Sequence, residues 1–154
     1  MFPVTLRQLP ARQAITLPHQ GSYQTIGQTF EKLGGWCAMR GLIPGTGHMV
    51  GIYYDDPAVV PEAELRSAAG LLVDPPPSVE APVSIAPIHG GEHAVLLHQG
   101  PYSTLPEAYH WLYRTWLPQS GRQAADAPVF EEYLNDPRQT APHELLTEIC
   151  LPLR

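Results

Sequence analysis

The sequence has few cysteines and no long apolar run. Cys37 and Cys150 are the only cysteines among 154 residues, and neither has a partner at metal-ligand spacing. Neither a disulfide framework nor a zinc site is therefore expected. No apolar run approaches the roughly 20 residues of a membrane helix, and the N-terminus lacks the charged-then-apolar order of a signal peptide. We expect a soluble cytoplasmic protein that does not contact a membrane.

Positive charge is also scarce. Lys and Arg number 9 against 15 Asp and Glu, for a formal charge of −6, and the basic residues are scattered along the chain. A nucleic-acid footprint needs clustered cations that displace counterions from phosphates, so direct nucleic-acid binding is not expected. The motifs G-x-S-x-G, H-E-x-x-H, G-x-G-x-x-G and the P-loop do not occur. Without such a motif we expect neither a metal nor a cofactor.

A repeated segment organises the chain. His98-Gln99-Gly100-Pro101-Tyr102 follows His19-Gln20-Gly21-Ser22-Tyr23 at an offset of 79, which also relates Leu112 to Leu33. From Trp116 and Trp36 onward the offset is 80, which one residue inserted between Leu112 and Trp116 explains. A fixed offset marks a duplicated unit, and two copies are too few for a solenoid. We predict one domain over 1–154, built from pseudo-repeats at about 1–77 and 78–154.

The first half predicts a strand, a helix and two more strands. A strand over Val4 to Leu17, bent at its prolines, leads to the first His-Gln-Gly turn. Ser22 can cap the following helix, which ends either at Gly34-Gly35 or beyond Trp36, before Gly41. Apolar β-formers then indicate two further strands, at Met49 to Tyr54 and at Ala68 to Val73.

The second half repeats this order after a proline-rich connector and an edge strand at Val83 to Ile88. Its helix has Ser103 or Thr104 as a cap, with Glu107 completing a capping box, and we expect Pro118 and Gly121 to end it. Further strands are expected at His93 to His98, Val129 to Leu134 and Leu146 to Leu151. The predicted class is α+β, a pseudo-twofold body in which two main helices pack on antiparallel sheet.

Glu131 is the leading candidate for chemistry. In a strand it shares a face with Tyr133, whereas Phe130 and Glu132 point to the other side, and alternation does not decide which face is covered. From the pattern alone a solvated charge is the simpler interpretation. A buried carboxylate needs a partner, and beside tyrosines it would suit a cationic ligand.

Aromatic residues gather in the repeated segments, and most of them are expected to fill the core. A tyrosine-lined cleft between the halves would also suit a small molecule. His19 and His98 occupy equivalent turns, and for them we predict a structural role rather than a metal site.

The chain resembles the gyrase-inhibitor-like (GyrI-like) family over essentially its whole length. The segments that carry the resemblance are Gly90-Gly91-Glu92, His98-Gln99-Gly100-Pro101-Tyr102, Trp116-Leu117-Pro118-Gln119-Ser120-Gly121, Phe130-Glu131-Glu132-Tyr133-Leu134-Asn135-Asp136-Pro137 and Leu146-Thr147-Glu148-Ile149. That family includes a stand-alone DNA gyrase modulator and the effector-binding domains of AraC-type and MerR-type transcription regulators.

The resemblance implies duplicated β-α-β-β units with a cleft between the halves that accepts lipophilic, often cationic, small molecules. It implies that Glu131 meets the ligand charge. The ligand-binding residues expected on this basis are Glu131, Tyr133, Tyr102, Tyr23, Tyr53, Trp116 and Tyr109.

The resemblance also leaves the activity open. One alternative is a hydrolase of strained electrophilic natural products, with Glu131 as the base and Tyr133 or Tyr102 as the hydroxyl. Another is a protein that inhibits DNA gyrase, or modulates transcription, through a protein partner. Because Val4 begins the first expected strand, the sequence leaves no room for a helix-turn-helix before it. A binding protein is favoured over an enzyme.

Overall fold

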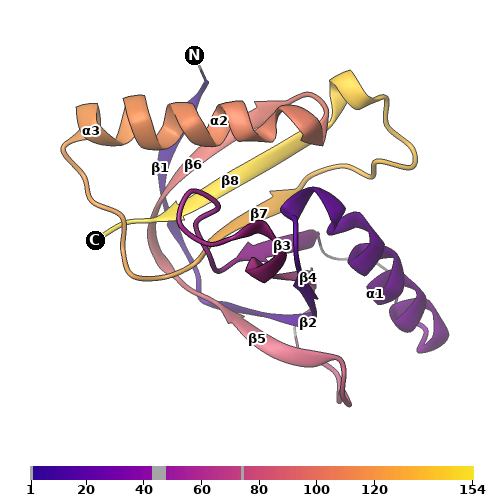
Figure 1. Ribbon diagram of the computed structural model, residues 1–154. Coiled ribbons are helices and arrows are strands. Elements are labelled where there is room, and N and C mark those ends of the chain that lie inside the picture. The colour runs from indigo at the N-terminus through magenta and orange to yellow at the C-terminus, as the bar shows by residue number, and fades with distance from the viewer. Residues whose placement is uncertain (1, 43–47, 74) are drawn as a thin grey trace. The chain divides into compact units, whose positions relative to one another are not determined.

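The computed structural model describes residues 2–42, 48–73 and 75–154 (Figure 1). It divides into two compact units. The N-unit comprises residues 11–89, and the C-unit comprises residues 1–10 together with 90–154.

The C-unit is a four-stranded antiparallel sheet with one helical segment. Its strands follow the order β1 (Val4–Leu9), β6 (Gly91–Gln99), β8 (Leu146–Pro152) and β7 (Val129–Tyr133). Between β6 and β7 run a 3₁₀ turn (Tyr102–Thr104), α2 (Leu105–Trp111), a π-helical turn (Leu112–Trp116) and α3 (Leu117–Ser120). Figure 1 shows α2 to α3 as one continuous rod.

The N-unit has the same plan. Its strands follow the order β5 (Ser84–Ile88), β2 (Arg12–Gln20), β4 (Arg66–Leu72) and β3 (Met49–Tyr53), all antiparallel. A 3₁₀ turn (Tyr23–Thr25) and α1 (Gly27–Met39) follow β2. Short 3₁₀ helices precede β4 in the N-unit, at Glu62–Glu64, and β8 in the C-unit, at Pro142–Glu144. The α+β class is confirmed. Each half contains the predicted order strand, helix, strand, strand, with one additional strand before it, β1 in the first half and β5 in the second.

Each helix covers one face of its own sheet. In the C-unit, Leu96 and Ile149 on neighbouring strands pack with Leu112 of the helical segment, and all three are fully buried. In the N-unit, Ile15 and Leu71 pack in the same way with Leu33 of α1. Alternate strand residues supply these contacts, because successive side chains of a strand point to opposite faces.

The two repeats share equivalent backbone hydrogen bonds at their His-Gln-Gly turns. The amide of Gly21 donates to the carbonyl of Leu65 at 2.8 Å, and that of Gly100 donates to the carbonyl of Leu145 at 2.9 Å. Both glycines have positive φ, 112° and 141°, which favours a residue without a Cβ at each turn. The duplicated turn therefore has one geometry in both halves.

The bent strand expected over Val4 to Leu17 is wrong. Two strands are present, β1 ending at Leu9 and β2 beginning at Arg12, and Pro10 between them has no amide to donate to a ladder. β1 pairs with β6 in the C-unit, whereas β5, its counterpart in the second repeat, pairs with β2 in the N-unit. Each unit therefore contains one edge strand from the other repeat.

The helix ends also differ in part from expectation. Of the two ends predicted for α1, the later one is found, with Gly41 at φ 70° just beyond it. The second helix continues past Pro118, which lies in the first turn of α3, and stops at left-handed Gly121. Pro118 follows directly on the π-helical turn Leu112–Trp116 and does not end the helix.

The capping box predicted at Thr104 is absent. Its hydroxyl donates instead to the carbonyl of Pro101 at 2.8 Å, and the side chain makes no capping bond. Ser22 caps the 3₁₀ turn Tyr23–Thr25, because its hydroxyl oxygen accepts from the amide of Gln24 at 3.2 Å. The N-cap of α1 itself is Ile26, which makes no side-chain capping bond.

The residue inserted in the second half has a structural equivalent. The π-helical turn Leu112–Trp116 lies where the offset between the halves changes from 79 to 80. A π turn holds one residue more than an α turn, so it absorbs the insertion without breaking the helix. Among the described residues, no helix is long and apolar enough to cross a membrane.

Candidate functional site

Glu131 is a buried carboxylate in the middle of β7. Its exposed fraction is 4 %, and that of Phe130 beside it is 2 %. In the ladder Glu131 lies opposite Ile149, which belongs to the cluster packed under the helix. The solvated charge that the sequence pattern favoured is therefore wrong, because both faces of β7 are covered at this point.

Two tyrosine hydroxyls hold the Glu131 carboxylate. Tyr109 Oη donates to Oε2 at 2.6 Å, and Tyr133 Oη donates to Oε1 at 2.7 Å. Tyr133 reaches it because residues two apart in a strand share a face. Tyr109 comes from α2, so helix and sheet both fix the carboxylate. Hydrogen bonds of this kind, between a neutral donor and an ionised acceptor, are short and strong.

Tyr102 adds a third ring to this cluster. Its ring meets that of Tyr133 edge to face, with centroids 5.6 Å apart. Burial, and then the negative charge of Glu131, raise the pKa of Tyr102 to about 12. The phenol is therefore protonated at neutral pH. Glu131, Tyr109, Tyr133 and Tyr102 together are called the carboxylate cluster below.

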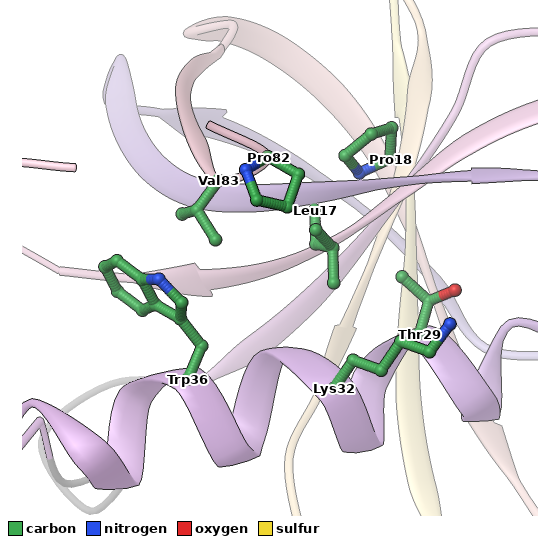
Figure 2. Close-up of a pocket in the computed structure, with 7 residues that line it drawn as sticks. All are labelled: Leu17, Pro18, Thr29, Lys32, Trp36, Pro82 and Val83. Carbon is green, nitrogen blue, oxygen red and sulfur yellow. The ribbon is translucent and has the colours of Figure 1, made fainter. Parts of the chain in front are cut away.

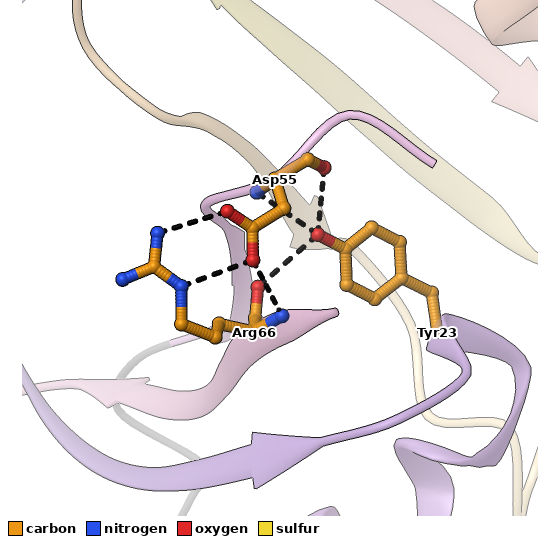
Figure 3. A network of polar contacts seen from close by, with 3 residues as sticks. All are labelled: Tyr23, Asp55 and Arg66. Atoms are coloured by element: carbon orange, nitrogen blue, oxygen red, sulfur yellow. Dashed lines mark hydrogen bonds and ion pairs between the residues drawn. The ribbon is translucent and has the colours of Figure 1, made fainter. Parts of the chain in front are cut away.

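Tyr23 and Tyr53 form the corresponding pair in the N-unit, with ring centroids 4.8 Å apart in an edge contact. Tyr23 Oη lies 2.7 Å from the carbonyl oxygen of Asp55 and accepts from the Asp55 amide at 3.0 Å (Figure 3). The Asp55 carboxylate in turn binds the Arg66 guanidinium at 2.8 and 3.0 Å, which lowers the pKa of Asp55. Tyr23 here anchors the end of β3 to the start of β4.

The N-unit has no copy of the carboxylate cluster. By the repeat offset, Gly51 stands where the C-unit has Glu131, and Phe30 where it has Tyr109. The Glu131 carboxylate and the Tyr109 hydroxyl are therefore specific to the second half, whereas Tyr133 has a counterpart in Tyr53. The cleft predicted between the halves stays a prediction, and the carboxylate cluster lies within the C-unit alone.

Trp116 is the remaining residue that was predicted to bind a ligand. It is partly buried at the end of the π turn and packs against the apolar core of the C-unit. Ligand binding by Trp116 stays a prediction.

The two histidines of the repeat support their turns. His98 Nε2 lies 2.9 Å from the Thr104 hydroxyl, and His19 Nε2 lies 3.1 Å from that of Thr25. His19 Nδ1 also lies 2.8 Å from the hydroxyl of Thr29. The structural role predicted for both is therefore confirmed. Within the ranges that the structure describes, no three His, Cys, Asp or Glu residues gather as metal ligands.

One difference between these turns was missed from the sequence. His98 Nδ1 is buried and has no hydrogen-bond partner among the described residues. The offset explains why, since Ala108 takes the place that Thr29 has in the first half. Comparing the aligned halves position by position would have found it.

Known proteins resemble this chain along its whole length. Residues 2–154 match the family model of the GyrI-like small molecule binding domain. The "Probable transcriptional regulator YgiV" of Escherichia coli K12 is 29 % identical, with 97 % of this chain and 95 % of that protein covered. A "DNA gyrase inhibitor" of Edwardsiella ictaluri is 30 % identical, with 98 % and 97 % covered.

Solved structures share the fold. The C-terminal domain of EcmrR has a TM-score of 0.81 at 18 % identity, covering 100 % of this chain and 98 % of that one. In the EcmrR–DNA complex, this chain spans only 57 % of the EcmrR chain. SAV2435 bound to tetraphenylphosphonium has a TM-score of 0.61 at 14 % identity, covering 99 % and 94 %. On the match over residues 2–154, the chain belongs to the GyrI-like family of small-molecule-binding domains.

Proposed function

We propose that the chain binds a lipophilic organic cation and that Glu131 supplies the opposing charge. The observation that carries this proposal is the pair of hydrogen bonds from Tyr109 and Tyr133, one to each carboxylate oxygen. They fix the carboxylate in one orientation, and as neutral donors they add no formal charge. An organic cation would then gain both the charge of Glu131 and the faces of the neighbouring rings.

Three tyrosine rings lie around the carboxylate. A cation over such a ring gains about 0.5–2 kcal/mol, more where water is excluded. Tyr102 remains a neutral phenol because its pKa is raised to about 12, so it adds ring surface without a competing charge. The tetraphenylphosphonium bound by SAV2435 is a ligand of the proposed kind, and it supplies a probe.

The test compares two ions of the same shape and opposite charge, tetraphenylphosphonium and tetraphenylborate, by isothermal titration calorimetry. The unchanged protein is expected to prefer the phosphonium. Glu131→Gln keeps the side-chain size and removes the charge. Losing one strong interaction with a charged group costs about 1.5–3 kcal/mol, so we expect phosphonium binding to weaken roughly 10- to 150-fold.

Glu107→Gln is the matched control, because Glu107 is an exposed carboxylate on α2 of the same unit. It makes the same change in net charge and should leave both affinities within about twofold, as a screened surface charge does. Equal weakening of both ions by Glu131→Gln would contradict the proposal. So would equal losses in the Glu131 and Glu107 variants.

A hydrolase is the second candidate, favoured by the 2.7 Å contact between Tyr133 Oη and Glu131 Oε1. That contact places a carboxylate base beside a phenolic proton donor, within the reach that general acid–base chemistry requires. Incubation with a panel of epoxides and aziridines, followed by mass spectrometry, tests it. One added water that is lost in Glu131→Gln supports hydrolysis, and recovery of every compound unchanged argues against it.

Inhibition of DNA gyrase through protein contact is a third proposal, and it is motivated by the relatives named gyrase inhibitors. Purified chain is added to a gyrase supercoiling reaction over a range of concentrations. Inhibition that persists in Glu131→Gln would separate this activity from small-molecule binding. Unchanged supercoiling at the highest concentration would remove the gyrase proposal.

A further inference from the structure

The N-unit has a pocket of its own, about 320 Å³ in volume (Figure 2). Pockets that bind small molecules begin at about 300 Å³, so this one is large enough for one or two fused rings. It lies between α1, the middle of β2 and the segment that enters β5. Its lining residues are Leu17, Pro18, Thr29, Lys32, Trp36, Pro82 and Val83.

The local structure explains why these side chains meet. Thr29, Lys32 and Trp36 are three and four residues apart on α1, so they share one face of the helix. Figure 2 shows Thr29 and Trp36 projecting toward the strand side, with Trp36 nearest Val83, whereas the Lys32 side chain extends along the helix toward Thr29. Leu17 and Val83 are buried, with exposed fractions of 9 % and 3 %. The pocket is therefore an aromatic and aliphatic slot.

Lys32 is the one charged side chain among the seven that line the pocket, and it is also the only lysine of the sequence. Glu80, two residues before Pro82 of the pocket wall, forms an ion pair with Arg40. The Arg40 guanidinium lies 4.0 Å from the Trp36 ring centroid. Because the charges of Arg40 and Glu80 offset each other, the charge preference of the pocket depends on Lys32, which favours an anion over a cation.

Aligned positions of the two repeats also differ in charge. The offset pairs Lys32 with Trp111, and it pairs Gly51 with Glu131. The N-unit thus has a cation where the C-unit has an aromatic ring, and no carboxylate where the C-unit has its buried one. The two units therefore differ in charge at these aligned positions, although each has a formal net charge of −3.

We propose that the pocket between α1 and β2 binds a planar aromatic anion of one or two fused rings. Its ring would lie against Trp36 and Val83, and its carboxylate or sulfonate would meet the Lys32 ammonium. This site is separate in its residues from the carboxylate cluster, and its ligand has the opposite charge. The proposal therefore goes beyond cation binding and does not depend on it.

The single lysine allows a direct test. Reductive methylation with isotope-labelled formaldehyde puts methyl groups on the amine of Lys32 and on the α-amine, and both keep their positive charge. Naphthoate is titrated and the methyl resonances are followed by NMR. We expect a saturable shift of the Lys32 signal, because the bound ring lies beside it. The α-amine signal serves as the internal reference.

Calorimetry on unmodified protein then measures the charge preference, with the neutral amide naphthamide as the matched ligand. Lys32→Gln should weaken naphthoate about two- to fivefold at low salt, the size expected for an exposed ion pair. Naphthamide binding should not change. Trp36→Ala should weaken both ligands, because both use the ring.

Arg114→Gln is the charge-matched control, since Arg114 is an exposed cation of the C-unit. An equal loss of naphthoate affinity in the Lys32 and Arg114 variants would overturn the proposal. A Lys32 methyl signal that does not move at saturating naphthoate would also overturn it. Tetraphenylphosphonium binding should be unaffected by Lys32→Gln, so failure of this site and failure of the Glu131 site give different results.

Discussion

Removing one hydroxyl from the carboxylate cluster should cost measurable stability. Tyr109→Phe deletes the donor that lies 2.6 Å from Glu131 Oε2 and leaves the ring in place. Phenylalanine is a natural choice, because Phe30 fills the equivalent position in the N-unit. A hydrogen bond to a charged group contributes about 1.5–3 kcal/mol, so we expect the free energy of unfolding to fall by that amount. For a chain of this size the midpoint temperature should drop by roughly 3–12 °C.

Urea denaturation followed by tryptophan fluorescence measures the loss, and a double-mutant cycle assigns it. In a Glu131→Gln background the acceptor is neutral, so the same Tyr109→Phe change should cost only about 0.5–1.5 kcal/mol. Tyr113→Phe removes a hydroxyl from a ring that is 39 % exposed, and it should change stability by less than about 0.5 kcal/mol. An equal cost of Tyr109→Phe in both backgrounds would refute our argument that the hydroxyl acts on the charge.

Three further predictions concern the C-unit. Burial lowers the pKa of His98, so the unfolded chain binds a proton at a higher pH than the folded protein does. The free energy of unfolding should therefore fall as pH drops below about 6.5. His98→Gln should remove this part of the pH dependence. Because Glu131 is the second cause, after burial, of the raised pKa of Tyr102, Glu131→Gln should move that pKa part of the way from about 12 toward 10 in an ultraviolet titration. Deleting Arg114 from the turn Leu112–Trp116 should convert it to an α turn and leave a folded protein with unchanged helical circular dichroism.

Each of these three predictions has a result that would contradict it. A pH dependence that is the same in His98→Gln would show that another group controls it. A Tyr102 pKa that stays near 12 in Glu131→Gln would assign the shift to burial and to Asp136 instead of Glu131. Loss of folding on deletion of Arg114, but not on Arg114→Gln, would show that the π turn is required and is more than a tolerated insertion.

Local sequence patterns predicted most of the elements. The alternation and β-forming residues of the strand that became β7 were sufficient to place it, and the fixed offset found the duplication without any structure. The offset even located the π turn, because its change between Leu112 and Trp116 requires one extra residue. These features depend on residues that are close in sequence or that are related by the offset between the two repeats.

What the sequence did not predict depends on long-range contacts. The pairing of β1 with β6 joins Val4 to Leu96, and nothing in the local pattern of either segment selects the other. Alternation placed Glu131 and Tyr133 on one face of β7 but did not show that the face is covered. The family resemblance supplied a role for Glu131. Only the structure shows Tyr109, 22 positions away, bonded to it.

The placement of the edge strands has a consequence for the origin of the protein and for how it can be divided. A cut at the repeat boundary, near residue 77, would leave the first fragment with β1 but without β5. The first fragment would keep β1, which pairs with β6 of the other fragment, and would lack β5, which pairs with its own β2. The second fragment would have the converse problem. An ancestor encoding a single repeat would have met this requirement by exchanging first strands between two identical copies. Gene fusion would then have made that exchange intramolecular, so residues 11–89, rather than 1–77, are the segment to express as an independent unit.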